Sequence, residues 1–471
     1  MAEIYNSNTN LKAAGVQVDF TPENIQEYIK CSQDPIYFIQ NYCYIVTLDH
    51  GLQLFKLYDC QKNKVNIIHS NRRVILMEGR QQGKTTTSAA YILWYTLFQS
   101  NKTVAILANK ATAAREVLDR YQIMYEALPM WLQQGVTTWN KGDIELENGS
   151  KVFTAATAAS GIRGKSVNLL YVDEAAIIPN TVAEAFFTSV YPTISAGTTT
   201  KILLSSTPLG YNHFWKFWND AEQGRNGFVP LFIPYWEIPG RDEKWANEQK
   251  AALGELKFTQ EVLCNFLGSS LTLVRADVIS KMSPDVIIYQ KDGLDCYVRP
   301  QKNHTYCMTV DIAEGVGGDY STFQVIDITE APYRIVAKFR QNDITPLLFP
   351  NIIHKVATEY NKAFVLVEIN MSDQVAQILH QELEYENIVM VNKTAGSQVV
   401  GGGFGGGKSY LGVSTDKRVK RVGCHNFKAM VEEDKLLITD PDTISEISTF
   451  IEKRSSYEAD EGYHDDLVMP L

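Results

Sequence analysis

The sequence predicts two α/β domains in succession, and three observations support this fold class. At 471 residues, the chain is longer than one hydrophobic core usually supports. From residue 73 onward, short apolar runs alternate with amphipathic segments, which is typical of a mostly parallel sheet with helices on both faces. Beyond residue 302, three strand-like runs follow one another closely before helices and strands alternate again. We therefore expect a second, differently built sheet.

Composition excludes several classes of protein. The net charge is -10 and the pI is about 5.4, so any contact with nucleic acid must come from local basic patches. The seven cysteines form no CxxC pair, and we expect reduced thiols rather than disulfides or a zinc site. No apolar run approaches the roughly 18 residues that span a bilayer, and the N-terminus lacks a signal peptide, so we expect neither a membrane segment nor secretion.

The first domain is expected to begin with helices and to continue as an alternating sheet. We assign residues 1–60 to an N-terminal helical region that breaks at Asp34-Pro35, and residues 61–270 to the domain itself, with a small lid subdomain near 225–270. Residues 143–156 alternate around Asn148-Gly149 and predict a hairpin. The buried parallel strands are expected in the runs at 73–79, 103–109, 169–175 and 201–207.

Two segments compete as phosphate-binding loops. Residues 402–409, GGFGGGKS, match the strict pattern GxxxxGK[ST], whereas residues 79–85, GRQQGKT, are one residue short of it. A phosphate loop works because a buried strand precedes it and a helix follows, so that backbone N–H groups converge on the phosphates. Only residues 79–85 have that context. We therefore predict a P-loop ATPase domain, and we interpret the glycines at 401–407 as a flexible loop.

The accepted loop assigns a role to several side chains. Lys84 should contact the β- and γ-phosphates of ATP, and Thr85 should bind Mg²⁺. Arg80, inside the loop, could neutralise charge on the γ-phosphate. At the end of the apolar run LLYV, Asp173 could hold the metal and Glu174 could polarise the attacking water.

A hydroxyl cluster ends the next strand. Ser205, Ser206 and Thr207 would lie near the γ-phosphate and could sense its hydrolysis, although a plain turn at the end of a strand is almost as compatible with these residues.

The second domain has the element order of the ribonuclease H-like fold. We assign residues 271–302 to a linker and residues 303–471 to this domain. Three antiparallel strands at 306–313, 321–328 and 333–339 precede the alternating elements. These are a helix at 347–360, a strand at 364–370, a helix at 373–385, a strand at 387–392 and a helix at 417–434.

Acidic residues of the second domain predict metal chemistry. Asp311 lies within the first strand, Asp319 lies in the turn GVGGD, and Glu368 ends the fourth strand. Asp465 and Asp466 open what is expected to be a last helix. Two Mg²⁺ or Mn²⁺ ions about 4 Å apart need several carboxylates, which can come from distant positions when strands are neighbours. Most of the 54 acids must be solvated surface charges, but a carboxylate inside an apolar strand is costly without a partner.

A basic stretch follows the glycine-rich loop. Its cations at a helix start could grip phosphates, or they could simply form a solvated helix face. They are Lys417, Arg418, Lys420, Arg421 and Lys428.

With both sites placed, the chain resembles the large terminase subunit of tailed phages, of the T-even myophage type. The similar strings run along nearly the whole length: GRQQGKT, EVLDR, WNKGDIELENGS, LLYVDEAAIIPN, SSTPLGYNHFW, TVDIAEGVGGDY, EINMS and EGYHDDLVM. The resemblance implies a packaging motor that uses ATP to move double-stranded DNA into the procapsid and an endonuclease that cuts it. It implies the portal protein and the small terminase subunit as partners, a homo-oligomeric ring, and a place in the host cytoplasm.

The resemblance also assigns site residues. It implies Arg80 as an internal arginine finger, Glu174 as the catalytic acid of the motor, and Asp311, Glu368 and Asp466 as the nuclease triad, with Asp319 in support. Asp466 is favoured over Asp465 by the family pattern. Nucleotide contacts are implied for Gln61, Gly79, Arg80, Gln81, Gln82, Gly83, Lys84, Thr85, Asp173, Ser205, Ser206 and Thr207.

Two departures leave alternatives open. The glycine-rich stretch 396–412 is longer than the family's equivalent, and Pro470 lies close behind Asp466, where proline would interrupt a helix. We expect the C-terminal helix to be truncated or incomplete. The alternatives to a motor with a nuclease are a catalytically impaired terminase that acts as an adaptor for the portal or DNA, and a helicase-like translocase.

Overall fold

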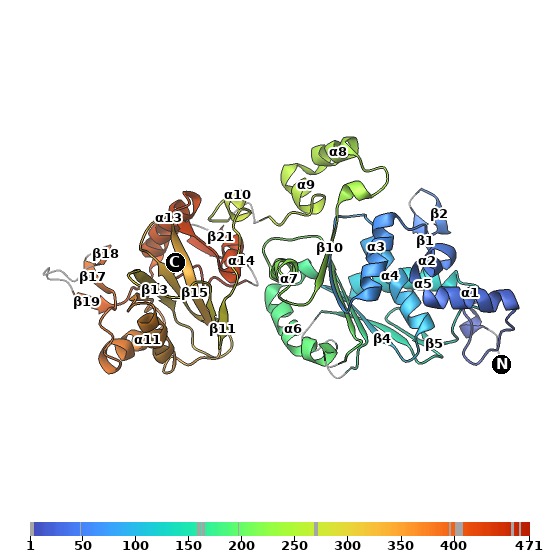
Figure 1. Ribbon diagram of the computed structural model, residues 1–471, viewed down its shortest axis with the longest axis horizontal. Coiled ribbons are helices and arrows are strands. Elements are labelled where there is room, and N and C mark those ends of the chain that lie inside the picture. Colours follow the sequence, from blue (N-terminus) through green and yellow to red (C-terminus); the bar gives the residue numbers. More distant parts are fainter. Residues whose placement is uncertain are drawn as a thin grey trace. The chain divides into compact units, whose positions relative to one another are not determined.

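The computed structural model describes residues 4–47, 49–157, 162, 165–195, 197–267, 272–394, 397–400, 408–453, 456–460 and 463–471. The chain divides into two compact units, Met1–Phe266 and Leu267–Leu471, coloured blue to green and yellow to red in Figure 1. Each unit has its own sheet and its own hydrophobic core.

The first unit contains a sheet with the strand order β10-β3-β9-β8-β4-β7-β6-β5. The six strands from β10 to β7 are parallel, β6 and β7 form the predicted antiparallel hairpin, and β5 pairs antiparallel with β6. The strands are β3 (Arg73–Glu78), β4 (Thr103–Ala108), β5 (Val136–Trp139), β6 (Asp143–Leu146), β7 (Lys151–Ala156), β8 (Leu169–Asp173), β9 (Lys201–Ser206) and β10 (Val229–Ile233). The strand that precedes the phosphate loop, β3, therefore lies inside the sheet, beside β9.

Helices cover both faces of this sheet because the strands are apolar on both sides. Val74 and Leu76 of β3 belong to one hydrophobic cluster, and Ile75 and Met77 belong to another on the opposite face. The first cluster includes residues of α2 (Pro35–Tyr42), α3 (Asp59–Ser70), α4 (Lys84–Phe98) and α5 (Ala111–Glu126), and the second includes residues of α6 (Asn180–Ser195) and α7 (His213–Glu222).

Smaller elements complete the first unit. Helix α1 (Pro22–Gln33) ends at the predicted break, where Asp34 accepts hydrogen bonds from the N–H groups of Ile36 and Tyr37 and so caps α2. The region 1–60 also contains η1 (Tyr5–Ser7) and an unpredicted hairpin of β1 (Tyr44–Thr47) and β2 (Gly51–Leu54). The remaining elements are η2 (Ala175–Ile177), η3 (Tyr235–Glu237), α8 (Glu243–Leu253) and α9 (Glu255–Glu261).

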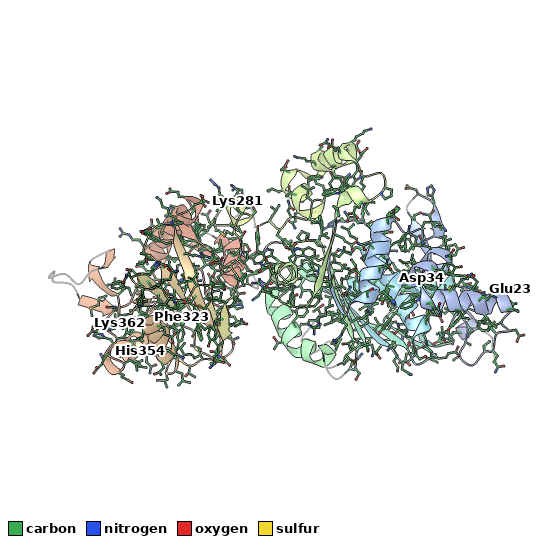
Figure 2. The ribbon with its side chains drawn as sticks, in the orientation of Figure 1. Glu23, Asp34, Lys281, Phe323, His354 and Lys362 are labelled. Atoms are coloured by element: carbon green, nitrogen blue, oxygen red, sulfur yellow. The ribbon has the colours of Figure 1, made fainter. Side chains whose placement is uncertain are left out.

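The second unit is built on a mixed sheet with the order β11-β12-β15-β14-β13-β16, and β20 also pairs with β15. Strands β13, β14 and β15 form the predicted antiparallel meander, and β16 lies parallel to β13. Phe323 of β14 is fully buried in its core (Figure 2). The strands are β11 (Tyr289–Lys291), β12 (Leu294–Cys296), β13 (Tyr306–Asp311), β14 (Ser321–Asp327), β15 (Tyr333–Gln341), β16 (Phe364–Val367) and β20 (Leu436–Leu437).

The segment 271–302, expected as a linker, contributes to this unit. It contains α10 (Ala276–Ile279) and the strands β11 and β12, of which β12 pairs with β15. The other elements are α11 (Phe349–Glu359), α12 (Gln374–Gln377), the π-helix η4 (Ile378–Glu382), β17 (Met390–Thr394), β18 (Ser397–Val400), β19 (Lys408–Leu411), α13 (Lys417–Glu432), α14 (Pro441–Thr449), β21 (Phe450–Lys453) and β22 (Ser456–Ala459).

Two local predictions for the second unit concern the glycine-rich stretch at 402–409 and the last helix. In the strict match at 402–409, residues 402–407 lie outside the described part of the chain, and Lys408 and Ser409 begin strand β19 rather than a helix. The context of a phosphate loop is therefore missing there. The last helix, expected to begin at Asp465 and to be truncated or incomplete, is a single turn, in which the Met469 N–H bonds to the Asp465 C=O at 2.9 Å.

Within the described residues, helices long and apolar enough to cross a membrane are absent.

Candidate active sites

The phosphate loop of the first unit has the strand–loop–helix arrangement that its chemistry requires. Strand β3 ends at Glu78, and α4 begins at Lys84. Gly83 adopts φ of +84°, and a Cβ there would lie 2.6 Å from Nε2 of Gln61, so only glycine fits without displacement. Gln61 donates from that nitrogen to the Gln82 carbonyl at 3.1 Å. Gln61, for which a nucleotide contact is predicted, is thus hydrogen-bonded to the loop.

Lysine, threonine and the two acids of the predicted motor site meet at the ends of β8 and α4. Lys84 Nζ lies 2.7 Å from Glu174 Oε1, and Thr85 Oγ1 donates to Asp173 Oδ2 at 3.1 Å. Tyr171 donates to the other oxygen of Asp173 at 2.8 Å. Burial raises the pKa of Asp173, and the charge of Lys84 opposes that rise.

The hydroxyl cluster at the end of β9 touches this group. Ser206 Oγ accepts from the Ala176 N–H at 3.0 Å and donates to Glu174 Oε2 at 3.4 Å. Ser205 and Thr207 are buried beside it. Glu174 itself has φ of +50°, a conformation that L-residues adopt at a cost. Its carboxylate is therefore held between Lys84 and Ser206.

Arg80 is paired with a glutamate of helix α9. Its Nε and Nη2 lie 2.6 Å and 3.2 Å from the two carboxylate oxygens of Glu261, a bidentate pair. Arg241 donates to the carbonyls of Arg80 and Gln81 at 3.3 Å and 2.7 Å. The segment predicted as a lid thus contacts the phosphate loop through both its glutamate and its arginine.

A buried ion pair beneath the loop was missed by sequence reasoning. Lys64 Nζ donates to Glu78 Oε1 at 2.6 Å and to the Lys84 carbonyl at 2.8 Å, and both side chains are at most 1% exposed. A signal was present, because Glu78 ends an apolar strand and such an acid needs a partner. The cation that pairs with Glu78 is Lys64 of α3, and its position in the sequence did not mark it as the partner.

These residues fit a magnesium-bound triphosphate. Lys84 offers an ammonium, Thr85 and Asp173 offer the oxygen ligands that Mg²⁺ prefers, and the loop ends at the N-terminus of α4. The buried Gln82 side chain also has two polar atoms without a partner, inside the loop.

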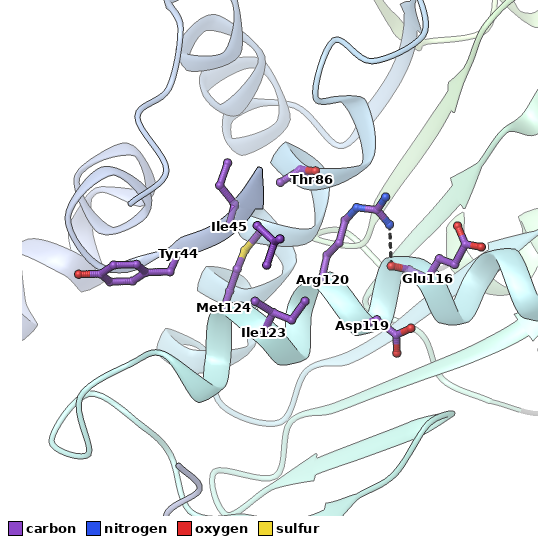
Figure 3. A pocket seen from close by; sticks show the side chains of 9 residues that line it. Tyr44, Ile45, Thr86, Glu116, Asp119, Arg120, Ile123 and Met124 are labelled. Atoms are coloured by element: carbon purple, nitrogen blue, oxygen red, sulfur yellow. Dashed lines mark hydrogen bonds between the residues drawn. The ribbon is translucent and has the colours of Figure 1, made fainter. Parts of the chain in front are cut away.

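A separate cavity of about 370 Å³ adjoins the first turn of α4 (Figure 3). Its polar wall includes Thr86, which follows the predicted metal ligand Thr85, and Arg120 of α5, whose guanidinium donates to the Glu116 carbonyl at 2.7 Å. Tyr44 and Ile45 of the β1–β2 hairpin form its apolar wall. No sequence pattern predicted this cavity.

In the second unit, two predicted acids face each other across neighbouring strands. Val310 of β13 pairs with Val367 of β16, and therefore Asp311 and Glu368 follow side by side. Burial, followed by the charge of Glu368, raises the pKa of Asp311 to about 9. Within the described residues, neither carboxylate has a lysine or arginine as an ion-pair partner.

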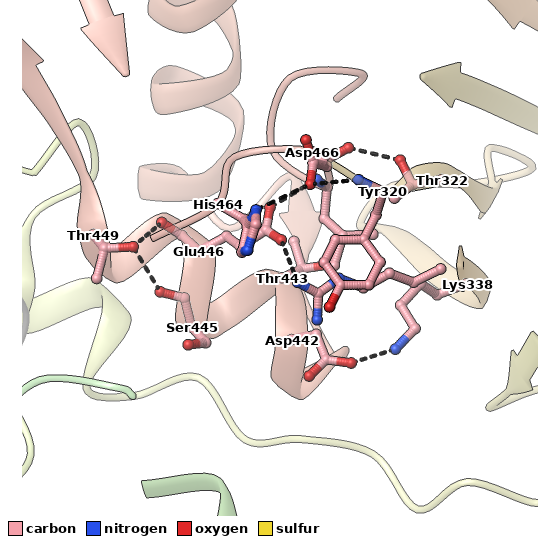
Figure 4. Close-up of polar contacts among 12 residues, drawn as sticks. Tyr320, Thr322, Lys338, Asp442, Thr443, Ser445, Glu446, Thr449, His464 and Asp466 are labelled. Atoms are coloured by element: carbon pink, nitrogen blue, oxygen red, sulfur yellow. Dashed lines mark hydrogen bonds and ion pairs between the residues drawn. The ribbon is translucent and has the colours of Figure 1, made fainter. Parts of the chain in front are cut away.

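Asp466 closes this site from the C-terminal turn. It is 9% exposed, its Oδ2 accepts from the Tyr320 N–H at 3.1 Å, and its carbonyl accepts from Thr322 at 2.6 Å (Figure 4). Its negative charge contributes to the raised pKa of Asp311. Ligand atoms of Asp319, His464 and Asp466 lie within 4.8 Å of one another. His464 was missed, although it immediately precedes the predicted pair of aspartates.

The structure separates the two neighbouring aspartates. Asp465 Oδ2 accepts from the Ala459 N–H at 3.3 Å and lies 3.9 Å from Lys420. Asp466 alone of this pair reaches Asp319 and His464. Because one turn replaces the expected helix, the direction of each side chain is set by that turn.

A buried glutamate and an arginine lie behind Asp466. Glu446 of α14 accepts from the Leu467 N–H at 2.7 Å, and its other oxygen lies 3.8 Å from Arg340. Burial raises the pKa of Glu446 to about 8, although the positive charge of Arg340 opposes this. Arg340 also lies over the ring of Tyr320 at 3.8 Å, and that ring contacts His464 edge-on (Figure 4).

The donor set of the second unit fits divalent cations. Carboxylates are the ligands of Mg²⁺ and Mn²⁺, and an imidazole suits transition metals. Among the described residues, the facing acids Asp311 and Glu368 have no lysine or arginine as an ion-pair partner, so a metal ion would supply the missing positive charge. The residues that would hold it are Asp311, Asp319, Glu368, His464 and Asp466.

Two family descriptions match this chain. Residues 75–280 match Terminase large subunit, T4likevirus-type, N-terminal, and residues 308–469 match Terminase RNaseH-like domain. Together these stretches cover well over half of the chain. Among curated proteins, the terminase large subunits of Thermus virus P23-45 and Thermus phage G20c are 23% and 24% identical over 264 residues, which is 52% of this chain and 52% of each relative. The chain thus spans about half the length of the curated relatives it matches.

Solved structures extend the likeness in fold. The large terminase of bacteriophage HK97 matches with a TM-score of 0.50 and 10% identity, covering 93% of this chain and 98% of that one. Together with the two family matches, this agreement confirms the predicted fold class, an ATPase-type sheet followed by a ribonuclease H-like unit.

Proposed function

Because this chain belongs to the family of terminase large subunits, we propose that it is the ATP-driven motor and the nuclease of a viral DNA-packaging machine. The observation that carries the proposal is the presence of two separately built acidic sites, one on each unit. A helicase-like translocase would need the first site only, and so the second site favours the packaging enzyme.

In the motor, the residues of the phosphate loop bind the triphosphate and prepare the water. Lys84 and Arg80 contact phosphate oxygens, and each must first leave a glutamate to do so. When Lys84 leaves, Glu174 becomes free to orient the attacking water and to accept its proton. Thr85 and Asp173 would hold Mg²⁺, which would supply positive charge to the phosphates.

In the nuclease, Asp311, Glu368 and Asp466 would hold divalent metal ions, with Asp319 and His464 beside them. Divalent cations bound there, Mg²⁺ or Mn²⁺, would lower the pKa of water and supply positive charge to the leaving oxygen of the phosphodiester. The exposed cations at the start of α13, Lys417 and Arg421 among them, contact the DNA backbone. The substrate is double-stranded DNA, which the same chain moves.

The proposed setting follows from this function. A packaging motor works at the portal of a procapsid in the host cytoplasm, as a ring of copies of this chain and together with the small terminase subunit. We propose these partners because a terminase large subunit needs them to package DNA.

The test separates the two activities in the full-length protein. Glu174→Gln should abolish ATP turnover and keep Mn²⁺-dependent cleavage of plasmid DNA, and Asp311→Asn should do the reverse. Normal ATP turnover in Glu174→Gln together with normal DNA cleavage in Asp311→Asn would contradict the assignment of the two sites. A wild-type protein that binds DNA but neither hydrolyses ATP nor cuts DNA would support the adaptor instead.

A further inference from the structure

An exposed asparagine connects the nuclease acids to the basic helix. Asn370 follows Glu368 by two residues, and its Nδ2 donates to Glu368 Oε1 at 3.0 Å and to the Thr415 carbonyl at 2.8 Å. Its Oδ1 accepts from the Thr415 N–H at 2.9 Å and from Ser414 Oγ at 3.0 Å. All the hydrogen-bonding capacity of this amide is used, which is unusual for an exposed side chain.

The backbone of Thr415 determines the orientation of the amide. A main-chain N–H can only donate and a main-chain carbonyl can only accept, so Oδ1 must face the first and Nδ2 the second. The second hydrogen of Nδ2 then points to Glu368. The amide cannot flip to present its oxygen to Glu368, because Thr415 fixes its orientation. Asn370 thus fixes the position of Glu368 Oε1, an oxygen of a carboxylate that would hold a metal ion.

Thr415 immediately precedes the basic helix. Asp416 caps α13 by accepting from the N–H groups of Arg418 and Val419 at 2.9 Å and 2.8 Å. Lys417 and Arg421 on the first turns of α13 are exposed. A displacement of this helix start on contact with DNA phosphates would therefore reach Thr415, then Asn370, and then Glu368.

The backbone at this point is held independently of the asparagine side chain. Val413 N–H bonds to the Val367 carbonyl and Ile369 N–H bonds to the Val413 carbonyl, at 2.8 Å and 2.9 Å. Removal of the Asn370 amide leaves both bonds in place. The side chain therefore positions Glu368 rather than holding the fold together.

From this geometry we propose that Asn370 is a positioning residue that couples DNA engagement by the start of helix α13 to cation binding at Glu368. The inference rests on the proposed nuclease function and adds a regulation of that site: DNA contact completes the metal site. Thermodynamic linkage requires the reverse as well, so bound metal must tighten DNA binding by the same factor.

The experiment measures metal and DNA binding, with no readout of cleavage. Mn²⁺ affinity of the full-length protein is measured by electron paramagnetic resonance of free Mn²⁺, with and without a cleavage-resistant phosphorothioate DNA duplex. We expect the duplex to tighten Mn²⁺ binding by about 5-fold or more in the wild type, and by less than about 2-fold in Asn370→Ala. We also expect Asn370→Ala to weaken Mn²⁺ binding about 10-fold without DNA, as is common when the hydrogen-bond partner of a metal ligand is lost.

Asn361→Ala is the matched control. Asn361 is exposed in the same unit and its amide donates to the carbonyls of Gln301 and His304 at 2.7 Å and 2.9 Å. It too bridges main-chain segments, but it contacts none of the nuclease acids. This variant should keep the coupling of the wild type.

The outcomes separate the inference from the function on which it rests. Coupling in Asn370→Ala equal to that of the wild type would overturn the inference, and so would a wild type in which the duplex leaves Mn²⁺ affinity unchanged. Failure of the proposed nuclease function would look different: Mn²⁺ affinity of the wild type would then match that of Asp311→Asn.

Discussion

The two candidate sites gather carboxylates in opposite electrostatic settings. Around the phosphate loop of the first unit, three glutamates pair with cations of the protein: Glu78 with Lys64, Glu174 with Lys84 and Glu261 with Arg80. In the second unit, Asp311 and Glu368 face each other, and Asp466 approaches them with a histidine as its neighbour. Both sites lie at the ends of neighbouring strands, so the difference lies in the partners.

The charge balance of each site before binding determines which kind of ligand it takes up. A site whose acids are already paired with protein cations is stable without a ligand. When an anionic ligand binds, these cations leave the acids and pair with the ligand. A site whose acids face one another must keep a proton until metal ions replace it. The motor site is thus built for exchange with a phosphate anion, and the nuclease site for the uptake of cations.

The largest expected effect comes from breaking the balance beneath the phosphate loop. Lys64→Ala leaves Glu78 buried without a partner and should destabilise the first unit by about 3–5 kcal/mol. All seven tryptophans lie in the first unit, so urea unfolding followed by tryptophan fluorescence reports on that unit alone. The control, Lys62→Ala on the same helix, removes an exposed pair with Asp59 and should cost about 0–1 kcal/mol. Equal costs for both variants would contradict the charge balance described here.

The next largest effect is expected on acidification, which adds a positive charge to a buried histidine of the first unit. His213 donates from Nε2 to the Ala175 carbonyl at 2.8 Å, its Nδ1 lies 2.9 Å from Oδ1 of Asn180, and burial lowers its pKa to about 4. Its unfolded pKa is higher, so the unfolded chain binds more protons below about pH 6.5 and stability falls with falling pH. We expect a loss of roughly 2 kcal/mol between pH 7 and pH 5.

His213→Asn should flatten this slope when tryptophan fluorescence is followed, whereas His50→Asn in the exposed β1–β2 turn should keep it. A wild-type first unit that gains stability on acidification to pH 5 would show that the imidazole is already charged in the folded protein.

A smaller effect of opposite sign is expected in the second unit. Asp311→Asn removes a carboxyl group that must stay protonated without metal, so it should stabilise the metal-free unit by about 1–2 kcal/mol. It should also abolish stabilisation by Mn²⁺. Hydrogen exchange of peptides from β13 and β14, with and without chelator, measures both effects.

The exposed Asp343→Asn is the control and should change neither quantity. If Asp311→Asn destabilised the metal-free unit, Asp311 would be a partner in a favourable pair rather than a member of an uncompensated group.

The smallest effect concerns the exposed pair at the phosphate loop. Glu261→Gln should change stability by about 0–1 kcal/mol, because Arg80 is largely exposed. It should tighten ATP about 2- to 5-fold, because Arg80 no longer has to leave a carboxylate. Fluorescent nucleotide titration measures this. Glu255→Gln, at the start of the same helix and paired with Lys250, should leave ATP affinity unchanged, and weaker ATP binding in Glu261→Gln would mean that Glu261 assists binding instead.

Local patterns predicted the fold and much of the geometry of both sites. The loop at 79–85 was distinguished from the glycines at 401–407 by its strand and helix, and Asp311 and Glu368 stood out because they interrupt apolar strands. Neighbouring strands then bring such acids together, whatever their separation along the chain.

What sequence reasoning missed are partners supplied by other elements. Glu78 required a cation, but Lys64 of α3 carries no mark that distinguishes it from other lysines. Glu261 and Asn370 likewise act through contacts that local spacing does not encode. Asp465 and Asp466 were not distinguished by helix geometry because the C-terminal segment forms a single turn.

The most direct test of the contrast between the two sites is anomalous diffraction from crystals of the full-length protein soaked in Mn²⁺ without nucleotide. The account predicts manganese peaks in contact with Asp311, Glu368 and Asp466, and no peak beside Asp173, where the phosphates of ATP are required to complete the ligands. Manganese bound at Asp173 with the acids of the second unit left empty would contradict it.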